Sequence, residues 1–210
     1  MAASDTEILF DGPDDAVLTL ALAHGAGAPM DSPFMAAFAE GLGARGLRVA
    51  RFEFPYMALR RSEGRKKPPD REPVLLESWR AVIERLGPDR LAIGGKSMGG
   101  RMASLVADET GVQALVCLGY PFHPPGKPER LRTAHLEALR TPTLIVQGSR
   151  DPFGTREDVA GYRLSKAIRL HWAEDGDHGL KPRKASGRSE AQNWDEAMGA
   201  IAGFLGDLDR

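Results

Sequence analysis

Residues Gly94–Arg101 read GGKSMGGR, and the interpretation of this stretch decides how the rest of the chain is understood. As Gly-Lys-Ser it is similar to the end of a phosphate-binding P-loop, whereas as Gly95-Lys-Ser97-Met-Gly99 it is G-x-S-x-G, a turn that exposes a serine between a strand and a helix. A P-loop needs a glycine separated from the Gly-Lys pair by four residues, because that glycine lets the backbone wrap the phosphates. Arg90 stands at that position, so we favour the serine turn.

The residues around Ser97 are those that a strained strand-to-helix turn requires. The apolar run 91–94 predicts a strand that leads directly into the turn, and residues 98–107 can continue as a helix. Gly95 and Gly99, two residues before and after the serine, leave the space that a crowded turn needs. We therefore predict that Ser97 is a nucleophile, against the alternative of a glycine-rich turn with an ordinary serine.

Short apolar segments alternate with segments of helical period along the whole chain. The predicted strands are apolar on both faces, as strands buried in a parallel sheet are. They cover residues 8–10, 17–23, 47–54, 91–94, 114–118, 143–146 and 168–172, and the predicted helices cover residues 33–44, 72–86, 98–110, 130–139, 156–164 and 190–208. The alternation predicts one α/β domain over residues 1–210, with a mostly parallel sheet of about seven strands, helices on both faces and little or no cap domain.

In a parallel sheet the loops that follow the strands lie at one edge, where ligands bind. α/β hydrolases carry an acid and then a histidine after later strands than the one that leads to the serine. Asp151 follows the sixth predicted strand, and His178 follows the seventh. We predict that His178 accepts the Ser97 proton and that Asp151 orients the imidazole, with Asp175 or Asp177 as alternative acids.

The tetrahedral intermediate of acyl transfer needs backbone N–H donors that are in place before it forms. One is predicted to be that of Met98, the residue after the serine. The other is predicted to come from the loop after the second strand, where the sequence HGAGA starts at His24. We assign Ala26, with Gly27 as the alternative, and interpret His24 as a residue that holds this loop by hydrogen bonding.

Six segments of the sequence together resemble one branch of a known superfamily. They are HGAGAPMDSPFM, RFEFPYM, GGKSMGGRMAS, LGYPFHPPGKPE, VQGSRDPFG and EDGDHGLK, and they extend from His24 nearly to the last predicted helix. The chain is similar to the α/β-hydrolase superfamily, to its dienelactone-hydrolase-like branch and to the small group of testis-expressed and chromatin-complex-subunit hydrolase-like proteins. The resemblance implies a lidless or nearly lidless hydrolase core with Ser97, Asp151 and His178 as its triad. Dienelactone hydrolases carry a cysteine at the position of Ser97, so their lactone activity is not implied.

Four more residues at the same edge of the sheet are candidate contacts to the substrate. Lys96 precedes the nucleophile, and we interpret it as a solvated side chain, with an ion pair of Lys96 or Arg101 to Glu53 beneath the turn as the alternative. Tyr120 and His123 lie in a proline-rich loop, and we interpret His123 as part of the pocket wall. The candidate substrate contacts are therefore Gly27, Lys96, Tyr120 and His123.

Composition and charge exclude several classes of protein. With 28 Lys and Arg against 29 Asp and Glu, the net charge is −1, which gives no reason to expect nucleic acid or a membrane as a partner. No run approaches the ~18 apolar residues of a membrane span, and the N-terminus lacks the basic start of a secretion signal. Cys117 lies in an apolar run, and no His, Cys and carboxylate cluster has the spacing of a metal site. We expect a cytoplasmic protein that needs no metal or organic cofactor.

These residues predict a serine hydrolase that acts on an ester, thioester or related acyl bond of a small molecule. The alternative is a catalytically silent interaction module with the same fold. Arg60–Arg71 is predicted to be a mobile or lid-like segment, and its basic side chains and those of Lys181–Arg188 are predicted to flank one mouth. They are either ordinary solvated loop charges or a positive rim that favours anionic substrates or partners. The sequence leaves the acyl group, the leaving group and the oligomeric state open.

Overall fold

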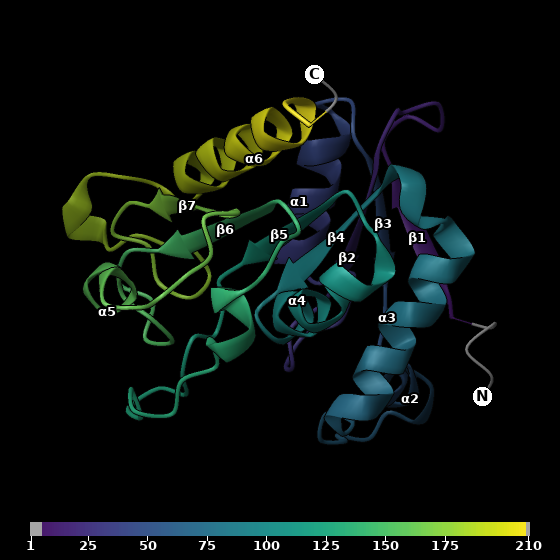
Figure 1. Cartoon of the computed structure of the whole chain (residues 1–210), viewed down its shortest axis with the longest axis horizontal. Coiled ribbons are helices and arrows are strands. Elements are labelled where there is room, and N and C mark those ends of the chain that lie inside the picture. The colour runs from purple at the N-terminus through teal and green to yellow at the C-terminus, as the bar shows by residue number, and fades with distance from the viewer. Residues whose placement is uncertain (1–5, 209–210) are drawn as a thin grey trace.

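The sheet of this protein has seven strands, and the computed structural model describes residues 6–208 of the chain (Figure 1). The strands are β1 (Ile8–Asp11), β2 (Thr19–Ala23), β3 (Arg48–Phe52), β4 (Leu91–Lys96), β5 (Ala114–Leu118), β6 (Thr143–Gly148) and β7 (Ile168–Ala173). The α-helices are α1 (Pro33–Gly43), α2 (Pro55–Glu63), α3 (Glu72–Leu86), α4 (Met98–Thr110), α5 (Arg156–Ala160) and α6 (Glu190–Gly206). Short 3-10 helices span Pro88–Arg90, Ala134–Glu137 and Lys184–Ser186.

The strand order brings the predicted site to the middle of the sheet. The order is β1-β3-β2-β4-β5-β6-β7, with β1 antiparallel to β3 and the other neighbours parallel. β4 lies between β2 and β5, so that Gly95 pairs with Ala23 on one side and with Cys117 on the other. The turn after β4 therefore lies beside the loops that follow its neighbouring strands. The predicted fold class, an α/β sheet that is mostly parallel, is confirmed.

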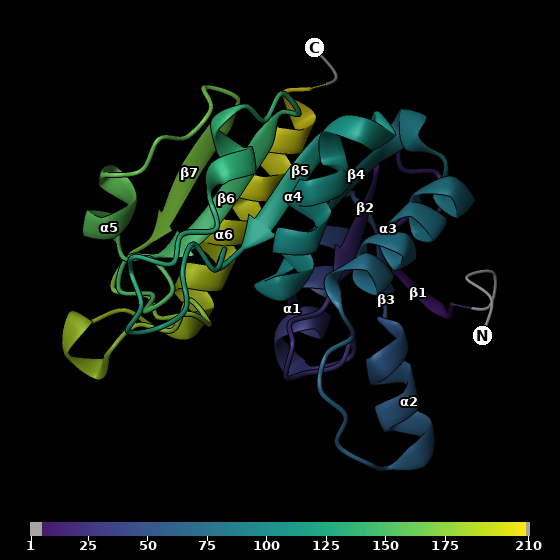
Figure 2. The same cartoon turned by 60° about the horizontal axis from the view of Figure 1, so that its bottom comes forward.

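Helices cover both faces of the sheet and create two apolar cores. α3 and α4 lie on one face and α1 and α6 on the other (Figures 1 and 2). Trp79 and Met102 are buried in the first core, and Phe38 and Ile201 are buried in the second. Within residues 6–208, no helix combines the length and the apolar character that crossing a bilayer requires.

Helix α2 is an element that the sequence did not predict. It begins at Pro55, whose ring fixes φ near the helical value and whose missing N–H would have had no acceptor within the helix. It ends before Gly64, which has the left-handed conformation with a φ of 65°. Only Tyr56 and Met57 of this helix are buried, so the apolar period is too short to be recognised. The predicted mobile segment Arg60–Arg71 therefore starts inside a helix.

The predicted helix over residues 130–139 is wrong, and only the 3-10 turn Ala134–Glu137 forms there. Backbone groups of this segment bind other parts of the protein instead. Arg132 N–H donates to Phe122 O at 2.8 Å, and Arg132 O accepts from the Tyr120 hydroxyl at 2.9 Å. The predicted helix over residues 156–164 is shorter than expected and ends at Ala160.

Candidate active site

Ser97 lies between the end of β4 and the start of α4, in a backbone conformation that side-chain-bearing residues rarely adopt. Its φ is 51° and its ψ is −111°. A non-glycine residue held in such a region stores on the order of 1–3 kcal/mol of strain. Gly95 and Gly99 make the turn sterically feasible, because an added Cβ atom would lie 2.2 Å and 2.4 Å, respectively, from the backbone oxygen of Ala23. The turn therefore has the strained geometry that the G-x-S-x-G pattern predicts.

The loop after β2 lies alongside the serine turn. A Cβ atom on Gly25 would lie 3.8 Å from the Ser97 Cβ atom. Ala26 and Gly27 follow in the same loop and are exposed. Met98 begins α4, so its N–H has no acceptor within the helix. The two segments that were predicted to supply the oxyanion donors thus meet beside Ser97.

Two buried aromatic side chains hold this loop. His24 Nε2 accepts the Phe54 N–H at 3.1 Å, so the proton of the neutral ring is on Nδ1, which donates to Gly25 O at 2.7 Å. Burial lowers the pKa of His24, which favours this neutral form. The Tyr56 hydroxyl donates to Ala26 O at 3.0 Å, a contact that the sequence did not indicate. These bonds occupy the carbonyl oxygens of Gly25 and Ala26.

His178 is hydrogen-bonded to Asp151, as the order of the two residues along the chain predicted. The distance from His178 Nδ1 to Asp151 Oδ2 is 2.8 Å. Asp151 is fully buried, and it also accepts hydrogen bonds from the Gln147 side-chain amide at 3.0 Å and from Phe153 N–H at 2.8 Å. These donors fix the carboxylate, so the proton of the imidazole is held on Nδ1 and Nε2 keeps its lone pair.

The alternative acids Asp175 and Asp177 are engaged elsewhere. Asp175 accepts hydrogen bonds from the Arg183 N–H at 2.8 Å, from its Nε at 2.9 Å and from its Nη2. The side-chain bonds lower the pKa of Asp175 to about 2. Asp177 Oδ1 accepts from the N–H groups of Gly179 and Lys181, at 2.8 Å and 3.0 Å. The carboxylate that contacts His178 is therefore that of Asp151.

Three residues that position the pair were missed in the sequence. The Phe153 ring packs on the His178 ring, with the centroids 4.3 Å apart. Gly119 has a φ of 64°, and an added Cβ atom there would lie 3.3 Å from His178 Nδ1. Gln147 bridges Asp151 to the backbone of Tyr120. A single amide in the otherwise apolar strand β6 was the available signal for Gln147.

Comparison with known proteins assigns the family. Residues 16–206 match the alpha/beta hydrolase domain family. The chain belongs to the alpha/beta hydrolase family.

Three solved structures are similar to this α/β hydrolase over nearly their whole length. A homologue of α/β serine hydrolases from Coxiella burnetii is 19% identical, with a TM-score of 0.72 over 93% of this chain and 91% of that one. A serine hydrolase without a lid from Xanthomonas campestris is 19% identical, with a TM-score of 0.67 over 95% and 88%. A dienelactone hydrolase from Anabaena variabilis is 22% identical, with a TM-score of 0.69 over 97% and 90%. At these identities the likeness establishes the shared fold.

In this α/β hydrolase, Lys96 contacts the histidine loop. Its Nζ donates to the backbone oxygen of His178 and lies 5.3 Å from the centroid of the Phe34 ring. Burial lowers the pKa of Lys96 to about 8, although the nearby carboxylates of Asp151 and Asp177 oppose this shift. Lys96 thus connects the strand before the serine to the segment that carries His178.

The ion pair of Glu53 with Lys96 or Arg101, which was the alternative interpretation, does not form. Glu53 Oε1 pairs with Arg61 Nη2 at 2.7 Å. Arg101 Nη2 pairs with Glu72 Oε2 at 2.9 Å. Helix α2 brings Arg61 to Glu53, and because α2 was not predicted, this partner was not available to the sequence argument.

The pH dependence of stability tests the environment of Lys96. The folded protein releases the Lys96 proton near pH 8, whereas the unfolded chain keeps it until about pH 10.5. Between these values the unfolded chain binds more protons, so wild type gains stability from this residue as pH rises, and Lys96→Met lacks that gain. We therefore compare the free energies of unfolding of wild type and Lys96→Met, measured by urea titration at pH 7 and pH 10. Between these pH values, wild type should gain about 2 kcal/mol more than Lys96→Met. A difference that does not change with pH would contradict the buried position of the ammonium group.

Tyr120 and His123 do not line an open pocket, which corrects their assignment as substrate contacts. The exposed fraction is 0% for Tyr120 and 4% for His123. The Tyr120 hydroxyl donates to Arg132 O, and the His123 ring bonds Pro124 O at 2.9 Å. His123 N–H also donates to Phe153 O at 3.1 Å, so this loop supports the residue that packs on His178. Both rings therefore lie in the interior rather than at the surface.

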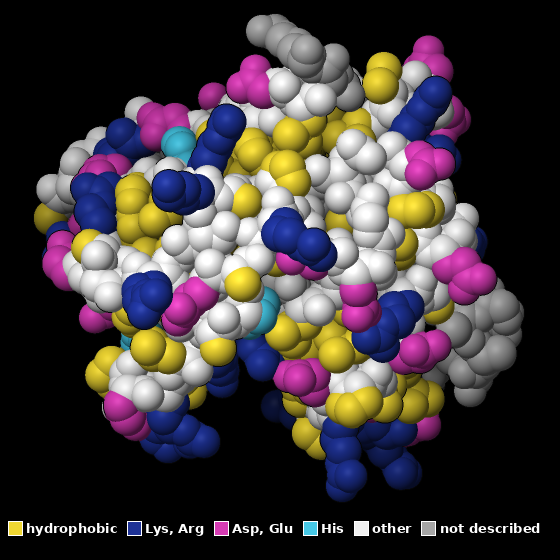
Figure 3. Space-filling model, in the orientation of Figure 1, with side chains coloured by type: hydrophobic (Ala, Val, Ile, Leu, Met, Phe, Trp, Pro, Cys, Tyr) yellow, Lys and Arg dark blue, Asp and Glu magenta, His cyan; other side chains and the backbone are white. Residues whose placement is uncertain are grey.

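Carboxylates neutralise part of the positive charge that was predicted at the carboxyl edge of the sheet. Within Lys181–Arg188, three of the four cations have carboxylate partners: Lys181–Glu190, Arg183–Asp175 and Arg188–Glu196. Figure 3 shows Lys and Arg side chains at the ends of two projections separated by a hollow, and Figure 1 shows that the ribbon of these projections is the loop after β5 and the region of α2. The loop after β5 contributes the exposed Lys127 and Arg130, and the segment after α2 contributes the exposed Arg65 and Lys66.

Within residues 6–208, no three His, Cys, Asp or Glu side chains are grouped so that they could hold a metal ion. Cys117 is buried in the first core, and burial raises the pKa of its thiol well above the usual range. A thiolate nucleophile at this position is therefore disfavoured.

Proposed function

We propose that this α/β hydrolase is a serine hydrolase that cleaves an ester, thioester or related acyl bond of a small molecule through an acyl-enzyme on Ser97. The observation that supports it most is the 2.8 Å bond between His178 and the buried Asp151, at the same sheet edge as the strained turn of Ser97. A strained serine, an imidazole with a fixed tautomer and a buried carboxylate are together the groups that acyl transfer requires.

The proposed reaction has two halves that use the same groups. Ser97 Oγ attacks the acyl carbon while its proton passes to His178 Nε2, and the N–H groups of Met98 and Ala26 receive the oxyanion. The intermediate collapses, the bond to the leaving group breaks, and His178 returns the proton to that group. Water then attacks the acyl-enzyme, gives its proton to His178, and releases the acid and free Ser97. Asp151 stabilises the imidazolium in both halves.

The class of substrate is a narrower proposal. Similarity to a serine hydrolase without a lid favours an open site and compact acyl groups over long lipids. The cations around the hollow in Figure 3 support anionic acyl groups, because charges of one sign around a concave site concentrate the opposite charge. The six sequence segments quoted above support a position near the testis-expressed and chromatin-complex-subunit hydrolase-like proteins, and Lys96 and Gly27 remain candidate contacts.

Labelling with a fluorophosphonate probe tests the proposed nucleophile, and the chain offers a matched control. Ser104 also contacts a histidine, with its Oγ 2.8 Å from His135 Nε2, but it is 3% exposed and donates to Arg101 O. We expect wild type and Ser104→Ala to be labelled and Ser97→Ala to remain unlabelled. If wild type stays unlabelled under conditions that label a known serine esterase, the silent interaction module replaces the enzyme as the better interpretation.

A further inference from the structure

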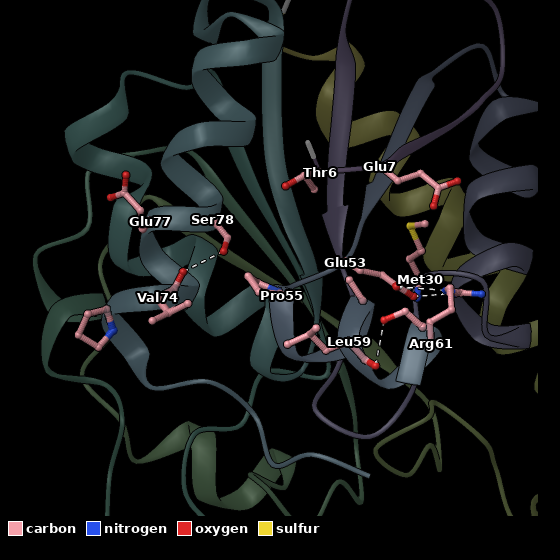
Figure 4. Close-up of a pocket in the computed structure, with 13 residues that line it drawn as sticks. Thr6, Glu7, Met30, Glu53, Pro55, Leu59, Arg61, Val74, Glu77 and Ser78 are labelled. Atoms are coloured by element: carbon pink, nitrogen blue, oxygen red, sulfur yellow. Dashed lines mark hydrogen bonds and ion pairs between the residues drawn. The ribbon is translucent and has the colours of Figure 1, made fainter. Parts of the chain in front are cut away.

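A large groove lies between α2 and α3 and beside β1 (Figure 4), and its lining includes none of Ser97, Asp151 and His178. Its volume is about 970 Å³, at the upper end of the roughly 300–1,000 Å³ of small-molecule sites. Tyr56, whose hydroxyl binds the loop of Ala26, does not belong to the lining of the groove. The groove is lined by Thr6, Glu7, Met30, Glu53, Pro55, Ala58, Leu59, Arg61, Ser62, Pro73, Val74, Glu77 and Ser78.

The two helices present apolar walls to the groove. Pro55, Ala58 and Leu59 lie on one face of α2, since they are three or four residues apart. Val74 projects from the first turn of α3 and is 44% exposed, which is high for a large apolar side chain. A ligand that covers these walls would be stabilised by the removal of apolar surface from water.

Most hydrogen-bond donors in the lining are already occupied. Arg61 directs its guanidinium to Asp31, at 2.9 and 2.8 Å, and to Glu53 at 2.7 Å. The hydroxyl groups of Ser62 and Ser78 donate to carbonyls of their own helices, at 3.3 and 2.8 Å. A ligand therefore meets few donors here, and a bound acceptor or anion would lose its hydration without replacement.

Two carboxylates in the lining keep free acceptor capacity. Within residues 6–208, Glu7 forms no ion pair, and the cation closest to Glu77 is Arg80 at 3.8 Å, which pairs more closely with Glu109 at 2.7 Å. Glu7 precedes β1 and Glu77 projects from α3, so the two flank the apolar walls from different elements (Figure 4). The lining combines an apolar trough with negative charge.

We propose that this groove binds an apolar amine, with its hydrocarbon part between α2 and α3 and its ammonium group at Glu77 or Glu7. The amine supplies hydrogen-bond donors and a positive charge to the carboxylates of Glu7 and Glu77, because the guanidinium of Arg61 is already paired with Asp31 and Glu53. The proposal concerns a site separate from Ser97, and it stands or falls independently of the proposed hydrolase activity.

Calorimetric titration of the full chain with three matched ligands tests the charge preference. The ligands are 4-phenylbutylamine, 4-phenylbutanol and 4-phenylbutyrate, which share the hydrocarbon part and differ in charge. We expect the amine to bind about tenfold more tightly than the alcohol, and the carboxylate to bind more weakly than both. Equal affinity for the three ligands, or a preference for the carboxylate, would overturn the proposal.

Three variants locate the binding. Val74→Lys places a cation across the apolar wall and is expected to abolish binding of both the amine and the alcohol. Glu77→Gln should weaken the amine about threefold, as expected for an exposed ion pair, and leave the alcohol unchanged. Glu84→Gln, an exposed position of α3 outside the lining, is the control and should change neither Kd. Amine binding that survives Val74→Lys would place the ligand elsewhere and refute the site.

Discussion

Asp151→Asn is expected to lower kcat for a short-chain acyl ester by about four orders of magnitude. The carboxylate of Asp151 lies 2.8 Å from His178 Nδ1 and keeps the proton there, so that Nε2 can accept the Ser97 proton. An amide in its place can donate to Nδ1 and select the wrong tautomer, and it cannot stabilise the imidazolium. Steady-state kinetics on the two purified proteins measure the effect.

The same substitution has a second, smaller consequence for stability. Gln147 donates its amide to Asp151 Oδ2 at 3.0 Å, and an amide nitrogen at that position would leave two donors facing each other. We expect a loss of about 1–3 kcal/mol in the free energy of unfolding, so kinetics should be measured well below the unfolding temperature. Asp175→Asn is the matched control and should retain kcat within about tenfold, because Asp175 pairs with Arg183. A loss in Asp175→Asn that equals the loss in Asp151→Asn would reassign the acid.

Gly99→Ala is expected to destabilise the protein by about 3 kcal/mol or more. The added Cβ atom would lie 2.4 Å from Ala23 O and 2.7 Å from His24 O, both backbone atoms that cannot move without disturbing β2 and the loop beside Ser97. Labelling by the fluorophosphonate probe should fall with the folded fraction. A bulkier change such as Gly99→Val should leave little soluble protein.

Gly199→Ala provides the comparison for this prediction. Gly199 is an exposed helical glycine of α6, and an added Cβ atom there has no neighbour within 4 Å among the described residues. The same substitution should therefore stabilise the protein by roughly 0.5–1 kcal/mol, through helix propensity alone. Thermal and urea unfolding of the two variants would show opposite shifts, and a mild effect at Gly99 would contradict the close approach of α4 to β2.

Regular elements with a buried face were predictable because their apolar period repeats over several turns or along a whole strand. The boundaries predicted for α3, α4 and β5 agree with the structure, and each of these elements packs many apolar side chains in the cores. Helix α2 was not predictable in this way, since only Tyr56 and Met57 are buried in it. The helix expected over residues 130–139 does not form for another reason. The backbone N–H and carbonyl of Arg132 are hydrogen-bonded to Phe122 and Tyr120, which are close in space but not in the sequence.

In the candidate site, too, local features were predictable from the sequence, whereas the partners of polar side chains were not. The sequence by itself determined the serine turn and the order in which Asp151 and His178 follow it, because small residues around a serine and loops after parallel strands are local features. Only the tertiary structure decided which of three nearby carboxylates contacts His178, that Lys96 donates to the His178 backbone rather than pairing with Glu53, and that Tyr120 and His123 are buried. The physical reason is that a charge or a polar group binds whichever partner the fold brings within about 3 Å, and many residues of this chain could chemically have served.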